Sequence, residues 1–70
     1  MDLVRLVFDR LHRAGTPDAA QRAAIYEECR TTVSALHPDP RQREAALSSL
    51  EKVIRRQEMQ ALYEERSLER

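Results

Sequence analysis

The stretch His37-Pro38-Asp39-Pro40 governs how this chain folds, because it separates two long segments with helical periodicity. Proline lacks a backbone N–H and disfavours the helical conformation at the residue before it, so Pro38 ends the preceding helix. Pro40 stands where proline is well tolerated, at the first position of a new helix, with Asp39 as its N-cap. Gln42 follows Asp39 at the spacing of a capping box. The stretch therefore predicts a short turn between two antiparallel helices.

Upstream of the turn, two helices are expected, over about residues 2–14 and 17–36. Gly15 separates them as a C-terminal stop for the first helix, and Thr16 is the expected N-cap of the second, with Pro17 in its first turn. The first helix has apolar residues at i, i+3 and i+4 spacing. The second has one stripe that we expect to be buried, counting Arg22 for its aliphatic stem: Ala19, Arg22, Tyr26, Cys29, Val33 and Leu36.

Downstream of the turn, residues 40–68 contain no helix breaker and predict one long, highly charged helix. Its apolar seam follows a coiled-coil-like 3-4 alternation that is regular from Leu47 to Ile54 and then meets polar residues at Gln57 and Glu64. About 30 helical residues would extend about 45 Å, well past the second helix. The overhanging end either frays or lies against another chain, and it is either the end of the protein or the front of a longer one.

Composition supports an all-α fold of three helices in one domain. The 70 residues include one glycine and three prolines, and only 4% are aromatic. A chain of this size buries about 60% of its unfolded surface, so it is marginally stable without help. The single cysteine, Cys29, cannot form an internal disulfide, which leaves a second copy or another protein as the source of stability. No stretch is long and apolar enough to span a membrane or resembles a signal peptide, so we expect a cytoplasmic location.

Charge gives little reason to expect nucleic acid as the partner. Twelve acidic and twelve basic residues cancel, and glutamates interrupt the basic positions. We expect Asp18/Arg22 and Glu51/Arg55 to form ion pairs within their helices. The alternative function is a small nucleic-acid-binding transcriptional regulator with a helix-turn-helix around Gly15, although its recognition helix would carry acidic residues toward phosphate. Eleven of the twelve cations are arginine, which we interpret as a coding bias of a bacterial source.

Nothing in the sequence predicts an enzyme, a cofactor or a metal site. His12 and His37 have no cysteine or carboxylate at ligand spacing, and we assign them to a helix surface and a helix end. Cys29 lies on the apolar stripe of the second helix, so core packing is favoured over a reactive thiol. The single Gly15 cannot form a phosphate-binding loop.

Three parts of the middle of the chain resemble a short helical module of uncharacterised alphaproteobacterial proteins. These are residues 22–30 (RAAIYEECR), 42–47 (QREAAL) and 50–56 (LEKVIRR), together with Leu36 and Pro38. The resemblance implies an amphipathic helical hairpin and a bacterial source. That module often stands at the front of larger, sometimes membrane-attached chains, and it implies no activity and no site residue.

The function predicted from the sequence is a non-catalytic protein–protein interaction module. We expect a homodimer or higher homo-oligomer, or docking of a helix from a second protein, because the apolar helix faces exceed what one copy can bury. If fold and contact surface are shared, Phe8→Ala and Leu50→Asp should both dissociate and unfold the assembly. The residues expected at the interface are Leu3, Leu6, Val7, Phe8, Leu11, Leu47, Leu50, Ile54, Ala61 and Leu62.

Overall fold

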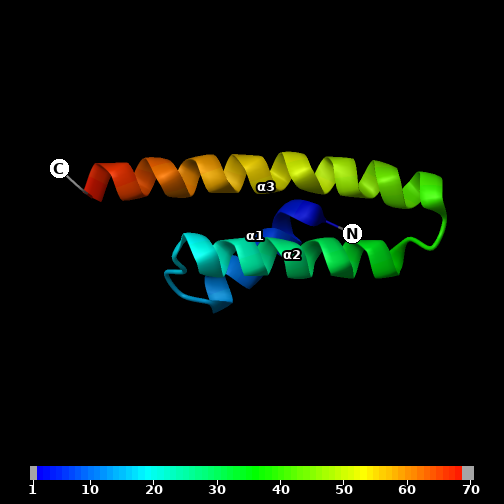
Figure 1. The fold of residues 1–70 in the computed structure, drawn as a ribbon, viewed down its shortest axis with the longest axis horizontal. Coiled ribbons are helices and arrows are strands. Elements are labelled where there is room, and N and C mark those ends of the chain that lie inside the picture. The colour runs from blue at the N-terminus through cyan, green and yellow to red at the C-terminus, as the bar shows by residue number, and fades with distance from the viewer. Residues whose placement is uncertain (1, 69–70) are drawn as a thin grey trace.

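The structure is a computed structural model that describes residues 2–68 and consists of three α-helices with short connections. Helix α1 spans Leu3–Arg13, α2 spans Ala19–Leu36 and α3 spans Pro40–Leu68. The described residues contain no β-strand, which confirms the all-α class. Figure 1 shows α3 along the whole length of the molecule, whose extents are 47 × 19 × 18 Å. No helix among the described residues has the length and apolar character needed to cross a membrane.

Helix α1 is closed at both ends by local hydrogen bonds. The Asp2 carboxylate accepts a hydrogen bond from the Arg5 backbone N–H at 3.2 Å, so Asp2 is the N-cap. At the other end Gly15 has a φ of +80°, a left-handed conformation that glycine adopts without steric cost. Its N–H donates to the His12 carbonyl at 3.1 Å, and this confirms Gly15 as the helix stop.

Helix α2 begins two residues later than expected, because its N-cap is Asp18 and the prediction of Thr16 was wrong. The Gln21 N–H donates to the Asp18 carboxylate, and the Asp18 N–H donates to the Gln21 side-chain oxygen, both at 2.8 Å. This reciprocal capping box satisfies two terminal N–H groups at once, whereas a threonine cap satisfies one. Pro17 therefore lies in the loop, where its carbonyl is free to accept a hydrogen bond from Arg22 at 2.9 Å.

The turn at residues 37–39 starts α3 with the expected N-cap but without the expected capping box. The Asp39 carboxylate caps the helix by accepting from the Arg41 N–H at 2.8 Å. Gln42 is exposed and makes no side-chain hydrogen bond within residues 2–68, so the predicted capping box at Asp39 was wrong. The turn returns the chain along α2, so that residues late in α2 meet residues early in α3 (Figure 1).

A small core forms where the three helices meet. Helix α1 contributes Val7, α2 contributes the middle of its predicted stripe and α3 contributes Leu50 and Ile54. The two ends of that stripe, Ala19 and Leu36, are exposed, so their predicted burial was wrong. Leu36 is 51% exposed because it lies at the turn, where α1 does not reach. The buried apolar residues are Val7, Tyr26, Cys29, Val33, Leu50 and Ile54.

Candidate interaction surface

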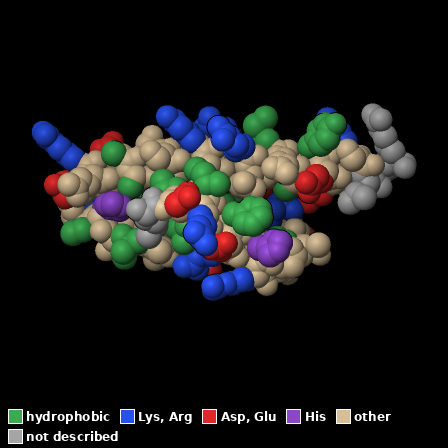
Figure 2. Space-filling model, turned by 180° about the vertical axis from the view of Figure 1, so that it is seen from behind, with side chains coloured by type: hydrophobic (Ala, Val, Ile, Leu, Met, Phe, Trp, Pro, Cys, Tyr) green, Lys and Arg blue, Asp and Glu red, His purple; other side chains and the backbone are tan. Residues whose placement is uncertain are grey.

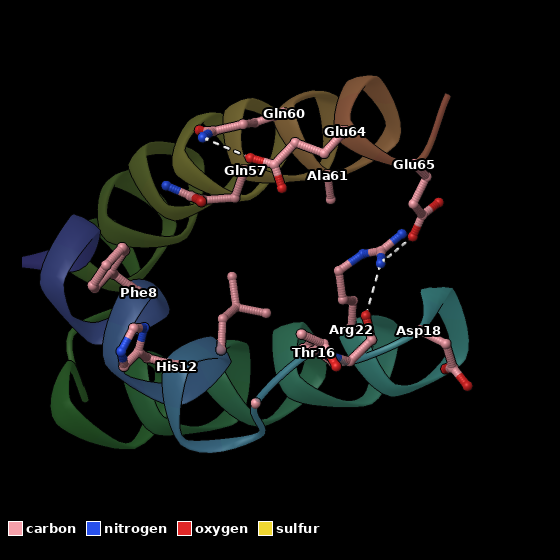
Figure 3. Close-up of a pocket in the computed structure, with 13 residues that line it drawn as sticks. Phe8, His12, Thr16, Asp18, Arg22, Gln57, Gln60, Ala61, Glu64 and Glu65 are labelled. Carbon is pink, nitrogen blue, oxygen red and sulfur yellow. Dashed lines mark hydrogen bonds and ion pairs between the residues drawn. The ribbon is translucent and has the colours of Figure 1, made fainter. Parts of the chain in front are cut away.

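A groove lies between the C-terminal half of α1, the α1–α2 loop and the distal half of α3 (Figure 3). Its volume is about 470 Å³. The apolar part of its lining comes from Phe8 and Leu11 on α1 and from Ala61 on α3. Amide and carboxylate groups surround this apolar part, and they belong to Asp18, Gln57, Gln60, Glu64 and Glu65.

Phe8 is the most conspicuous apolar side chain beside this groove. It is 51% exposed, and Val4, one helical turn before it, is 50% exposed. The Phe8 ring stacks on His12 with ring centroids 5.4 Å apart and an interplanar angle of 18°. Stacking fixes the ring at the edge of the groove instead of burying it. Val4 and Phe8 therefore form an apolar strip on α1 that its own chain leaves uncovered.

One end of the groove is closed by a buried charge cluster around Arg22, which is only 4% exposed. Its Nε donates to Glu58 Oε2 at 2.9 Å and its Nη2 to Glu58 Oε1 at 3.1 Å, a two-point contact. Its Nη1 donates to Glu65 Oε1 at 2.6 Å and to the Pro17 carbonyl at 2.9 Å. Tyr26 completes the cluster by donating its hydroxyl to Glu58 at 2.9 Å. The cluster connects the start of α2 to the distal half of α3.

The pKa values in this cluster follow from its hydrogen bonds and burial. The Arg22 guanidinium holds the pKa of Glu58 below its usual range, and the Glu58 carboxylate raises the pKa of Arg22. Burial, aided by the hydrogen bond to Glu58, raises the pKa of Tyr26 to about 12. All three groups therefore keep one protonation state over a wide range around neutral pH, which is typical of a structural cluster rather than a proton-transfer site.

Two further ion pairs connect the helices away from the groove. Arg30 of α2 makes a two-point contact with Glu51 of α3 at 2.9 and 3.0 Å. This contact lowers the pKa of Glu51. Arg10 of α1 reaches Glu28 of α2 at 3.4 Å and the Thr32 hydroxyl at 3.3 Å. Each helix pair that involves α2 is therefore held by an arginine.

The ten residues predicted at the interface differ in how far a single chain buries them. Val7, Leu50 and Ile54 are buried in the core of a single chain, and four others pack partly buried against that core: Leu3, Leu6, Leu11 and Leu47. Phe8, Ala61 and the partly buried Leu11 line the groove. Leu62 is 52% exposed and does not line the groove. The structure thus leaves Phe8 and Leu62 as the most exposed members of the predicted set.

Sequence reasoning missed the interhelical arginines and their acceptors. It assigned Asp18 to Arg22 and Glu51 to Arg55, but Arg22 pairs with Glu58 and Glu65, and Glu51 pairs with Arg30. A signal was present in the chain, because Glu51, Glu58 and Glu65 recur every seven residues. That spacing places them on one flank of α3.

The groups considered for chemistry occupy structural or surface positions. Cys29 is fully buried in the core, and this burial raises the pKa of its thiol. His12 is exposed beside Phe8, and His37 is the C-cap of α2. Within residues 2–68 no three His, Cys, Asp or Glu side chains are grouped so that they could hold a metal ion.

The chain matches no protein-family model, and searches of curated proteins and of solved structures also found no match.

Proposed function

We propose that this chain is a non-catalytic protein–protein interaction module that forms a homodimer through the groove and the strip beside it. The observation that carries the proposal is the position of Phe8, a half-exposed aromatic ring at the edge of an apolar-lined groove. A ring in this position can enter the groove of a second copy, while the second copy's Phe8 enters the groove of the first. Such reciprocal contacts are typical of two-fold symmetric dimers.

The small size of the core supports a need for association. Six apolar residues are buried among the described ones, and Val4 and Phe8 leave about half of their surface in water. Aromatic rings that become buried at an interface are among its strongest contributors. In the proposed dimer the antiparallel hairpin of α2 and α3 is the scaffold that presents α1, and two chains make a six-helix assembly.

The decisive variant is Phe8→Ser, and Leu36→Ser is its matched control. Both side chains are 51% exposed, but Leu36 lies at the turn, far from the groove. Light scattering across a dilution series should give the wild type and Leu36→Ser twice the chain mass of 8.2 kDa at high concentration. Phe8→Ser should give a single chain mass, with circular dichroism reporting its helix content. Leu50 is unsuitable for this purpose because it is fully buried within one chain.

The alternatives to the proposed homodimer predict different results in the same experiment. A wild type with a single chain mass at every concentration would contradict the homodimer, and docking of a partner helix would then be the remaining form of the proposal. Equal loss of dimer in Phe8→Ser and Leu36→Ser would contradict the assignment of the surface. The nucleic-acid alternative is less favoured because Arg22 and Arg30 are already paired with carboxylates.

A further inference from the structure

Helix α3 separates its charges by face, although the whole chain has a formal net charge of zero. Glu51, Glu58 and Glu65 lie on the flank toward α2, where Arg30 and Arg22 hold them. The side of the helix that faces away from the buried Leu50 and Ile54 carries cations and apolar groups at i, i+3, i+4, i+7 spacing. We name this side the outer stripe, and it consists of Lys52, Arg55, Arg56, Met59, Tyr63 and Arg66.

Every residue of the outer stripe is exposed, and two of its apolar members are unusually so. Met59 is 65% exposed and Tyr63 is 73% exposed, more than any other large apolar side chain in the described part of the chain. Figure 2 shows basic side chains along the α3 edge of the molecule, followed toward the C-terminal end by hydrophobic ones. Leu62, which is 52% exposed, borders the stripe at this end.

Of the four cations of the outer stripe, Arg55 lies close enough to an acid for its charge to help lower the pKa of Glu51. Within residues 2–68 no carboxylate lies at ion-pair distance from Lys52, Arg55, Arg56 or Arg66. The stripe also contains no acidic residue at its helical positions, because the glutamates between Lys52 and Arg66 fall on other faces. The result is a straight, mainly basic surface about 21 Å long.

We propose that the outer stripe docks on the surface of a lipid bilayer that contains anionic headgroups. Lipid phosphates and carboxylates complement the four cations, and clustered lysine and arginine on a helix bind such surfaces. Met59, Leu62 and Tyr63 then enter the boundary between headgroups and acyl chains, where tyrosine is energetically favoured. Helix α3 lies in the plane of the surface, since its other faces are packed against α1 and α2.

The apolar part of the stripe favours a membrane over nucleic acid. Phosphate backbones reward cations but offer no apolar layer for Met59 and Leu62. Binding to unpaired bases needs several aromatic rings on the basic face, and the stripe has only Tyr63. The stripe shares no residue with the groove, so the inference does not depend on the homodimer.

The test uses the full chain and sedimentation with vesicles of phosphatidylcholine alone or mixed with phosphatidylserine. We expect binding to the mixed vesicles, a loss of binding at high salt and little binding to phosphatidylcholine alone. Lys52→Gln with Arg56→Gln should weaken binding about 30-fold, since each of the two cations contributes a factor of about five near the surface. The matched control is Arg5→Gln with Arg13→Gln, which makes the same change of charge on α1.

A second pair of variants examines the apolar contribution at constant charge. Met59→Ser with Tyr63→Ser should weaken binding to the mixed vesicles several-fold, whereas Leu36→Ser, at an exposed position outside both proposed surfaces, should not. Equal weakening by the stripe and α1 charge variants would overturn the proposal, because net charge alone would then explain binding. Retention on an oligonucleotide without any retention on mixed vesicles would also overturn it. Circular dichroism of every variant is the control for folding.

Discussion

Arg22 is a buried cation whose hydrogen bonds connect α2 to the α1–α2 loop and to α3. Glu58, Glu65 and the Pro17 carbonyl accept from it, and within residues 2–68 no buried side-chain nitrogen or oxygen lacks a hydrogen-bond partner. A buried charge is costly unless its hydrogen bonds are all made. The cluster therefore specifies one position of the loop and the distal half of α3 against α2.

Replacing Glu58 tests how much this cluster contributes. Glu58→Gln removes the charge that faces Arg22 at two points, so we expect the free energy of unfolding to fall by about 2 kcal/mol. Urea denaturation followed by circular dichroism measures this change. Glu64→Gln is the matched control, because Glu64 is exposed and accepts a long, 3.4 Å hydrogen bond from Gln60. Equal effects of the two substitutions would show that the cluster does not stabilise the fold.

Acid should weaken the contact between α2 and α3. The pKa values of Glu51 and Glu58 are lower in the folded chain than is usual for glutamate, so the unfolded chain binds more protons in acid. Their contribution to stability is complete at neutral pH and is lost as the pH falls below about 4.3 toward the folded pKa values. Thermal unfolding at a series of pH values should therefore show a falling midpoint in this range. A doubly substituted Glu51→Gln, Glu58→Gln chain should show a smaller fall than the wild type, and an identical fall would contradict the assignment.

The start of α2 shows how one residue can set the boundary of an element. Asp18→Ala removes the carboxylate of the capping box and should lower the free energy of unfolding by about 1 kcal/mol. Thr16→Ala should have little effect, since α2 begins beyond it at Ala19. Denaturation curves of the two variants measure the difference. A larger effect at Thr16 than at Asp18 would restore the helix start expected from the sequence.

Local signals in the sequence sufficed for the helices, because each depends on neighbouring residues. Gly15 and Asp39 act through hydrogen bonds to residues at most four positions away. The stripe of α2 was also predictable, since Tyr26, Cys29 and Val33 share one face at helical spacing. The ion pairs between helices were not predictable, because arginine is long enough to reach another helix and its partner depends on how the helices pack. Burial of Leu36 failed for a related reason, since periodicity does not show where a neighbouring helix ends.

The candidate surface was only partly predictable for the same physical reason. Apolar periodicity identifies the faces of α1 and α3, but it does not separate residues buried within one chain from those left for another. Val7 and Leu50 are fully buried and Phe8 is half exposed, although all three belong to the same predicted set. The distinction depends on the crossing of the helices, which leaves the groove beside Phe8 unfilled.

The three helices form a narrow molecule with a small core and two surfaces of different character. The groove has an apolar part, lined by Phe8, Leu11 and Ala61, within a polar rim, and we propose that a second copy of the chain occupies it. The outer stripe is basic and faces away from the other two helices. In the proposed assembly these surfaces act independently, because no residue belongs to both.

The most direct test of the homodimer is a nuclear magnetic resonance experiment on an equimolar mixture of isotope-labelled and unlabelled chains. A filtered nuclear Overhauser spectrum detects only contacts between a labelled and an unlabelled copy. The account predicts intermolecular signals from the Phe8 ring to Leu11 and Ala61. Intermolecular signals that avoid Phe8, or no such signals at a concentration where light scattering shows twice the chain mass, would contradict it.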